Sequence, residues 1–181
     1  DRWVTESPNY HVQCNECGTF EQVESFRIKS EPNLGGQGFM TLHWSSPILV
    51  AKEVNRILKA NDIKGYDSWD VLIHATGVPS IEILQLYITE QTSPGLLYQE
   101  ELGFDGCEAC GERKYYAHTR GVMRYQRGAV PKCVDIMETQ EWFGAGGKSA
   151  YKEVFISNRL ARLILDQGWK GVMMKVVELV D

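Results

Sequence analysis

Two short cysteine motifs contain the residues of this 181-residue chain whose types and spacing suit metal chemistry. The first motif covers residues 14–18 (CNECG) and the second covers residues 107–111 (CEACG). Two residues between the cysteines let both thiolates face one ion from a single tight turn, and four thiolates complete a tetrahedral zinc shell. A closed shell leaves no position for water, so such a site is structural. We therefore predict a structural Zn2+ bound by Cys14, Cys17, Cys107 and Cys110.

Each motif ends in a glycine, Gly18 or Gly111, which permits a positive φ and lets backbone N–H groups turn toward the sulfurs. The 89 residues numbered 18–106 separate Cys17 from Cys107, far more than in a compact zinc ribbon. If the motifs share an ion, the metal joins two distant parts of the chain. One shared metal is favoured over two disulfides or two free pairs, and iron could occupy the same sulfurs.

A redox interpretation of the motifs stays open, because a CxxC pair can act as a dithiol where it opens a helix after a strand. Here each motif is followed by a turn and a strand-like stretch, so metal binding is favoured over redox catalysis. The fifth cysteine, Cys133, lies in an apolar stretch and is expected to be buried. His11 and His118 lie near the motifs, but ordinary surface or core positions are favoured for both.

Other catalytic motifs are missing from the sequence. Residues 147–149 resemble the end of a phosphate-binding P-loop, but Trp142 stands where that motif requires its first glycine. We expect a glycine-rich loop over 144–147, and for Trp142 and Phe143 a place in the core is favoured over an exposed contact patch. Neither HExxH, GxSxG nor a dinucleotide fingerprint occurs, which favours a protein that is not an enzyme.

The elements that must position the cysteine motifs are predicted from capping residues and apolar patterns. Ser46 is a good N-cap for a helix that ends near Asn61. A second helix over 158–167 follows Ser157 as N-cap and ends before Gly168, which suits a left-handed C-terminal cap. Residues 64–70 are expected to form a loop. Strands are expected over 20–28, 39–44, 71–75, 81–89, 113–117, 121–127, 132–137, 153–156 and 172–180.

This pattern predicts an α+β fold with a largely antiparallel sheet and a few helices. The four-cysteine zinc site is expected to join the N-terminal and central segments of a single domain over residues 1–181. The composition is ordinary for a globular domain, with 43% hydrophobic and 24% charged residues. No apolar run approaches the roughly 18 residues of a membrane span.

Charge and cysteine usage restrict the partners and the compartment. A net charge of −5 argues against direct binding to nucleic acid, which requires a basic face, and suits a partner of opposite charge. Four of five cysteines form CxxC pairs, which indicates a reducing compartment and a metal site. The chain begins at Asp1 without a methionine, so a missing or processed upstream segment is expected.

The paired CxxCG motifs, in a chain of this size, resemble the double-CXXCG motif family of myxobacteria. The resemblance covers nearly the whole chain, with the first motif close to the N-terminus and the second past the middle. The predicted ending, a strand, Ser157, a helix, Gly168 and a final strand, is similar to that of several bacterial immunity-protein families. The residues that match the defining motif are Cys14, Cys17, Gly18, Cys107, Cys110 and Gly111.

The resemblance implies an immunity protein of a kin-discrimination system. In such systems a toxin passes between touching cells by outer-membrane exchange, and a cognate immunity protein in the cytoplasm blocks it. The cysteines would then be scaffold, and the toxin-binding surface would lie elsewhere. The net charge of −5 suits a cationic toxin such as a nuclease, without contact to a membrane. Alternatives are a zinc-containing interaction or regulatory module with another partner and, less favoured, a thiol-redox enzyme.

Overall fold

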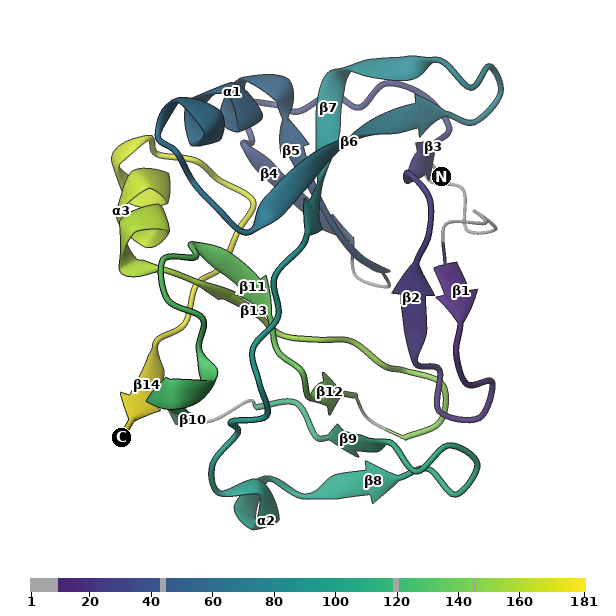
Figure 1. Cartoon of the computed structure of the whole chain (residues 1–181). Coiled ribbons are helices and arrows are strands. Elements are labelled where there is room, and N and C mark those ends of the chain that lie inside the picture. The colour runs from purple at the N-terminus through teal and green to yellow at the C-terminus, as the bar shows by residue number, and fades with distance from the viewer. Residues whose placement is uncertain (1–9, 43–44, 119–120, 145) are drawn as a thin grey trace.

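The computed structural model describes residues 10–42, 45–118, 121–144 and 146–181, and Figure 1 shows the order of its elements. The fold is α+β, as predicted from the sequence. Among the described residues, six of the nine strand pairings are antiparallel and three are parallel. The predicted antiparallel character is therefore confirmed, although the strands form several smaller sheets beside one large sheet.

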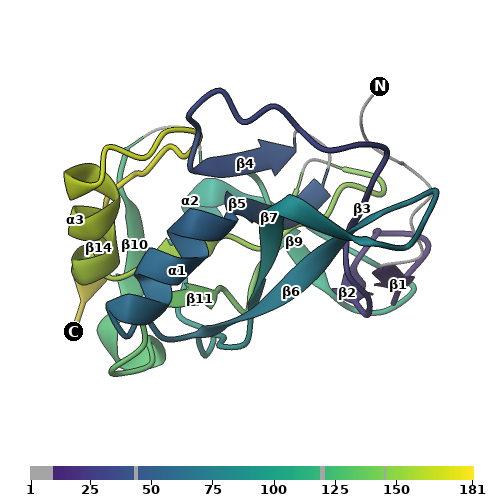
Figure 2. The ribbon, with the colours of Figure 1, turned by 90° about the horizontal axis from the view of Figure 1, so that it is seen from above.

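The large sheet is covered on both faces. Its strand order is β3 (Arg27–Ile28), β6 (Tyr66–Ile73), β7 (Pro79–Ile88), β5 (Ser45–Ala51), β4 (Phe39–Leu42). Successive side chains of a strand point to opposite faces, and Leu49 and Val50 in β5 are both fully buried. Val50 packs in a cluster with residues of α1 (Lys52–Ala60) and α3 (Asn158–Asp166), and α1 lies against β5 and β7 (Figure 2). Leu49 packs on the other face with Val71.

Helix α3 agrees with its sequence signals. The Ser157 side chain accepts a hydrogen bond from the backbone N–H of Leu160 at 3.1 Å, which confirms the predicted N-cap. Gly168 has a φ of +64°, as a left-handed residue after a helix requires. In the part of the chain that the structure describes, no helix is long and apolar enough to cross a membrane.

The predicted start of the first helix is wrong. Ser46 and Pro47 belong to β5, and α1 begins at Lys52 without a side-chain cap. The apolar run over 48–50 can fill both faces of the sheet as a strand, and this burial outweighs the local capping signal. The predicted loop over 64–70 is also wrong from Tyr66 onward, where β6 begins.

Most other predicted strands are present with shorter bounds. The predicted strand over 172–180 is reduced to β14 (Val177–Val180), which pairs in parallel with β10 (Met123–Gln126). Trp142 and Phe143 form β12 (Trp142–Phe143) and are buried, so their predicted place in the core is confirmed. A short helix α2 (Gln99–Leu102) precedes β8 (Phe104–Gly106), and a 3-10 turn (Arg127–Ala129) follows β10.

The remaining sheets are small and lie below and beside the large sheet in Figure 1. They include β1 (Tyr10–Val12), β2 (Phe20–Gln22), β9 (Arg113–Tyr115), β11 (Ile136–Glu138) and β13 (Val154–Ile156). The cysteine motifs lie on two antiparallel hairpins, one formed by β1 and β2 and the other by β8 and β9. Strand β12 extends the second hairpin in parallel.

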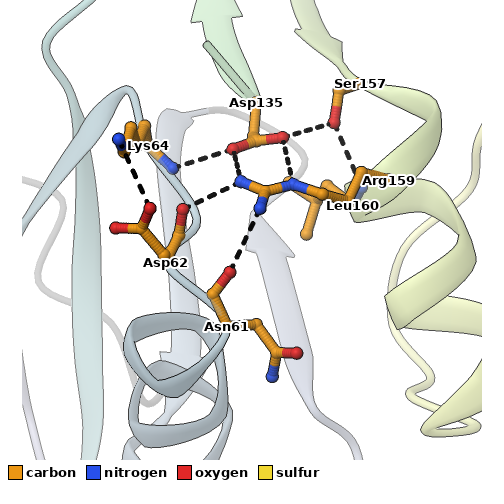
Figure 3. A network of polar contacts seen from close by, with 7 residues as sticks. All are labelled: Asn61, Asp62, Lys64, Asp135, Ser157, Arg159 and Leu160. Carbon is orange, nitrogen blue, oxygen red and sulfur yellow. Dashed lines mark hydrogen bonds and ion pairs between the residues drawn. The ribbon is translucent and has the colours of Figure 1, made fainter. Parts of the chain in front are cut away.

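A buried carboxylate connects α1, β11 and α3 (Figure 3). One oxygen of Asp135 accepts hydrogen bonds from the Ser157 hydroxyl at 2.7 Å and from Arg159 Nε at 3.0 Å. The other oxygen accepts the backbone N–H of Lys64 at 3.0 Å and a second Arg159 nitrogen. Arg159 also donates to the backbone carbonyl of Asp62, two residues after the end of α1. Elements far apart in the sequence are therefore joined through one side chain.

Candidate metal centre

The two cysteine motifs lie side by side. The first motif is the loop between β1 and β2, and the second is the loop between β8 and β9 (Figures 1 and 2). The Sγ atoms of Cys14 and Cys107 are 3.8 Å apart, and those of Cys17 and Cys110 are 3.6 Å apart. All four sulfurs lie within 4.8 Å of one another. The structure thus brings together the four cysteines that the sequence predicted as one set.

The spacing of the sulfurs fits a tetrahedral metal shell. Sulfurs bound to zinc at about 2.3 Å in a regular tetrahedron are about 3.8 Å from one another. The distances of 3.8 and 3.6 Å match this edge, whereas a disulfide requires about 2.05 Å. All cysteines of the chain are free thiols in the structure. The cluster could therefore hold a metal ion, and its donor set suits zinc and iron alike.

Both motifs have the same backbone geometry. The N–H of Gly18 donates to the carbonyl of Cys14 at 2.9 Å, and the N–H of Gly111 donates to the carbonyl of Cys107 at 2.8 Å. The two glycines have φ values of +77° and +79°, which confirms the predicted left-handed conformation. Each motif is followed by a strand, β2 or β9, and neither opens a helix. The context of a thioredoxin-like dithiol is therefore missing from both motifs.

The pKa values of two thiols in the cluster are shifted in opposite directions. Burial raises the pKa of Cys17, but hydrogen bonds from the Thr19 side chain and backbone and from Cys110 and Cys14 lower this pKa to about 6. A backbone hydrogen bond from Glu112 lowers the pKa of Cys110, but local desolvation of its sulfur and hydrogen bonds with the other thiols raise it to about 12. The negative charge of one thiolate therefore disfavours deprotonation of the other three thiols. A divalent cation removes this effect because it attracts all four thiolates.

Lys114 in β9 is a residue of the site that the sequence did not predict. Its side chain is buried, and its ammonium donates to the backbone carbonyls of Cys17 at 2.9 Å, Gly147 at 2.5 Å and Ser149 at 3.0 Å. Three carbonyl acceptors match the three donors of an ammonium, which makes its burial tolerable. No sequence signal indicates this role, because a lysine in a short strand is usually exposed.

The backbone of the first motif packs closely against Lys148, directly after the glycine-rich loop. A Cβ atom added to Gly18 would lie 2.0 Å from the carbonyl oxygen of Lys148. At Gly111, the equivalent glycine of the second motif, an added Cβ atom would have nothing within 4 Å. Phe20, shortly after the first motif, also packs edge to face on Trp142 with ring centroids 5.6 Å apart. The first motif is therefore closely packed against the rest of the molecule.

The other candidate residues do not join the cluster. Cys133 is exposed and has a φ of +62° in the turn before β11, so the prediction that it is buried is wrong. The apolar residues after it enter the core, but the turn leaves Cys133 outside. Among the described residues, the group of possible metal ligands consists of the four motif cysteines and includes neither His11 nor His118. The preference for ordinary positions of these histidines agrees with this.

Comparison with protein-family models, with curated proteins and with solved structures gives no match for this chain. The resemblance of its motifs to the double-CXXCG family therefore stays a prediction from the sequence.

Proposed function

We propose that the four-cysteine cluster is a structural zinc centre, and that the chain is a non-enzymatic immunity protein that binds and neutralises a cognate toxin. The observation that carries the metal part is the pair of sulfur–sulfur distances, 3.8 and 3.6 Å, between the two motifs. Four sulfurs saturate a tetrahedral zinc ion, so no coordination position is left for a substrate or an activated water. This supports a structural role in a protein that is not an enzyme.

The proposed role of the metal is to fasten the β1–β2 hairpin to the β8–β9 hairpin. Isolated two-stranded hairpins are marginally stable in water, because few side chains are buried. The β1 and β2 strands have three residues each, and Val12 is exposed. An ion bound by both loops would supply the missing stability, since binding energy at a site that forms only in the folded chain is folding energy.

The immunity part of the proposal is supported by the sequence. The paired CxxCG motifs resemble those of myxobacterial immunity proteins, and the net charge of −5 suits a cationic toxin, such as a nuclease, in the cytoplasm. Inhibition would be stoichiometric, through a surface that matches the toxin in shape and charge. The cysteine cluster would act as scaffold for this surface.

The metal part is tested by metal analysis of the purified protein and by thiol titration. We expect one zinc per chain, and we expect the four motif cysteines to be unreactive until a chelator is added. The exposed Cys133 is an internal control, because its thiol should react at once with or without the metal. Rapid reaction of one CxxC pair in the native protein would instead favour the redox alternative.

The immunity part is tested by expressing the toxin domain encoded next to this gene, with and without this protein, and counting surviving cells. We expect rescue by this chain and no rescue by a relative that has a different toxin partner. If both proteins are soluble and the cells still die, the immunity proposal fails for this pair. A zinc-containing interaction or regulatory module with another partner would then be the leading interpretation.

A further inference from the structure

We propose that Lys114 is a positioning residue of the metal centre, which strengthens zinc binding through its buried ammonium. This inference rests on the proposed zinc site. Lys114 is 2% exposed and lies in β9, four residues after Cys110. Its ammonium is within hydrogen-bond distance of three backbone carbonyls, one of which belongs to the metal ligand Cys17. The role follows from two features of this arrangement, its geometry and its charge.

The geometric feature is that Lys114 connects three segments at the cluster. Its backbone belongs to the strand that follows the second motif, while its ammonium donates to Cys17 of the first motif at 2.9 Å. The same ammonium donates to Gly147 in the glycine-rich loop and to Ser149, two residues after that loop. The first motif is therefore held beside the second by a contact that does not require the ion. Such preorganisation strengthens binding because less ordering remains when the metal binds.

The electrostatic feature is that Lys114 offsets negative charge. Four thiolates around one Zn2+ leave a net charge of roughly −2, and charge that is partly withdrawn from water requires compensation. An open cleft beside the cluster is lined by the carboxylates of Glu16, Asp105 and Glu108. Among the described residues that line this cleft, Lys114 supplies the cation. Its removal would take away the cation that lines the cleft beside these thiolates and carboxylates.

The test compares zinc affinity in Lys114→Met and Lys148→Met. Methionine keeps most of the length of the lysine side chain and removes its charge. Lys148 lies in the same loop system, but its side chain is exposed, so Lys148→Met is the matched control. Competition with a chromophoric zinc chelator gives the Kd of each protein. We expect Lys114→Met to weaken zinc binding by about 10- to 100-fold, as loss of groups that support metal ligands commonly does, and Lys148→Met to leave it unchanged.

Thermal unfolding with and without zinc separates this role from a merely structural one. If Lys114 only stabilises the fold, Lys114→Met lowers the melting temperature of the zinc-free and zinc-loaded proteins alike and leaves the Kd within about twofold of the parent. That result would overturn the inference. A wild-type chain that binds no zinc would overturn the proposed zinc centre itself, so the two failures are distinguishable.

If Lys114→Met does not fold, lysine acetylation of the wild-type protein provides a second test. Because zinc and Lys114 hold the same loop, we expect the Lys114 amine to be acetylated more slowly in the zinc-loaded protein than after chelation. The exposed Lys148 should react equally in both states, as quantified by peptide mass spectrometry. Equal reactivity of Lys114 in both states would contradict the coupling between this ammonium and the metal.

Discussion

The two CxxCG motifs share a backbone geometry but differ in their surroundings. Both are closed by the same glycine-to-cysteine hydrogen bond, and their glycine φ values are nearly equal, +77° against +79°. Cys14 and Cys17 are only 8% and 4% exposed, whereas Cys110 is exposed. The local sequence thus determines the shape of the turn, and the tertiary contacts determine how much the molecule depends on it. Equivalent substitutions in the two motifs measure this difference directly.

The largest expected effect is the loss of a metal ligand. Cys17→Ser and Cys110→Ser should both abolish tight zinc binding and cost about 3 kcal/mol or more in the free energy of unfolding, because loss of a metal site is among the few changes of that size. Cys17→Ser should cost more, since Cys17 is buried. Zinc content and thermal unfolding check this. An unchanged melting temperature in both variants would exclude a shared structural site.

The two motifs should differ most clearly in the stability loss caused by replacing their glycines. Gly18→Ala places a methyl group 2.0 Å from the Lys148 carbonyl oxygen, so the loop must move as well as accept a strained φ. Gly111→Ala meets no neighbour within 4 Å and carries only the left-handed strain, about 1–2 kcal/mol. We expect Gly18→Ala to lower the free energy of unfolding by at least about 1 kcal/mol more than Gly111→Ala does. Equal losses in urea titrations would show that the first motif is not fitted against the loop.

These comparisons show which features a sequence can reveal. The cysteine motifs and α3 were predicted correctly because their signals are local, namely a fixed spacing and a Ser157 cap. The start of α1 was predicted wrongly because burial of Leu49 and Val50 between two faces of a sheet is a tertiary effect. Lys114 was missed for the same reason, since its three carbonyl partners come from residues 17, 147 and 149.

The hydrogen-bond network of Asp135 contains no motif cysteine, so it provides a reference for how acid changes the stability of the fold. Burial raises the pKa of Asp135, but hydrogen bonds from Arg159, Ser157 and the Lys64 backbone, with the Arg159 charge, bring it below its usual value. The carboxylate therefore stabilises the fold above pH about 4, and this contribution is lost as the pH falls through the lowered pKa. Asp135→Asn should cost about 1–2 kcal/mol at neutral pH, because Arg159 is half exposed.

The loss of unfolding free energy caused by Asp135→Asn can be measured as a function of pH to test this prediction. Both proteins carry the same four motif cysteines, so protonation of their thiolates cancels in the difference between their free energies of unfolding. This difference should shrink as the pH falls from about 6 to below about 3, as urea unfolding at each pH would show. A difference that stays constant over this range would mean that the carboxylate charge does not contribute.

The smallest effect is expected at Cys133. Cys133→Ser should change the free energy of unfolding by no more than about 0.5 kcal/mol and leave the zinc content unchanged, because the side chain is exposed and outside the cluster. Its positive φ is the same in both proteins. A large loss of stability would place this turn under a constraint that its exposure does not suggest, and would weaken the contrast with the motif cysteines.

Because Cys110 is exposed, the rate of metal exchange would depend on different residues from the strength of metal binding. A zinc ion in this cluster would be bound by the buried Cys14 and Cys17 and by Cys110, which is exposed to solvent. An incoming chelator or cellular thiol would therefore reach and displace Cys110 first. The affinity would depend on all four sulfurs, but the lifetime of a bound ion would depend chiefly on this one. The protein could thus hold zinc tightly and still acquire it quickly from a donor.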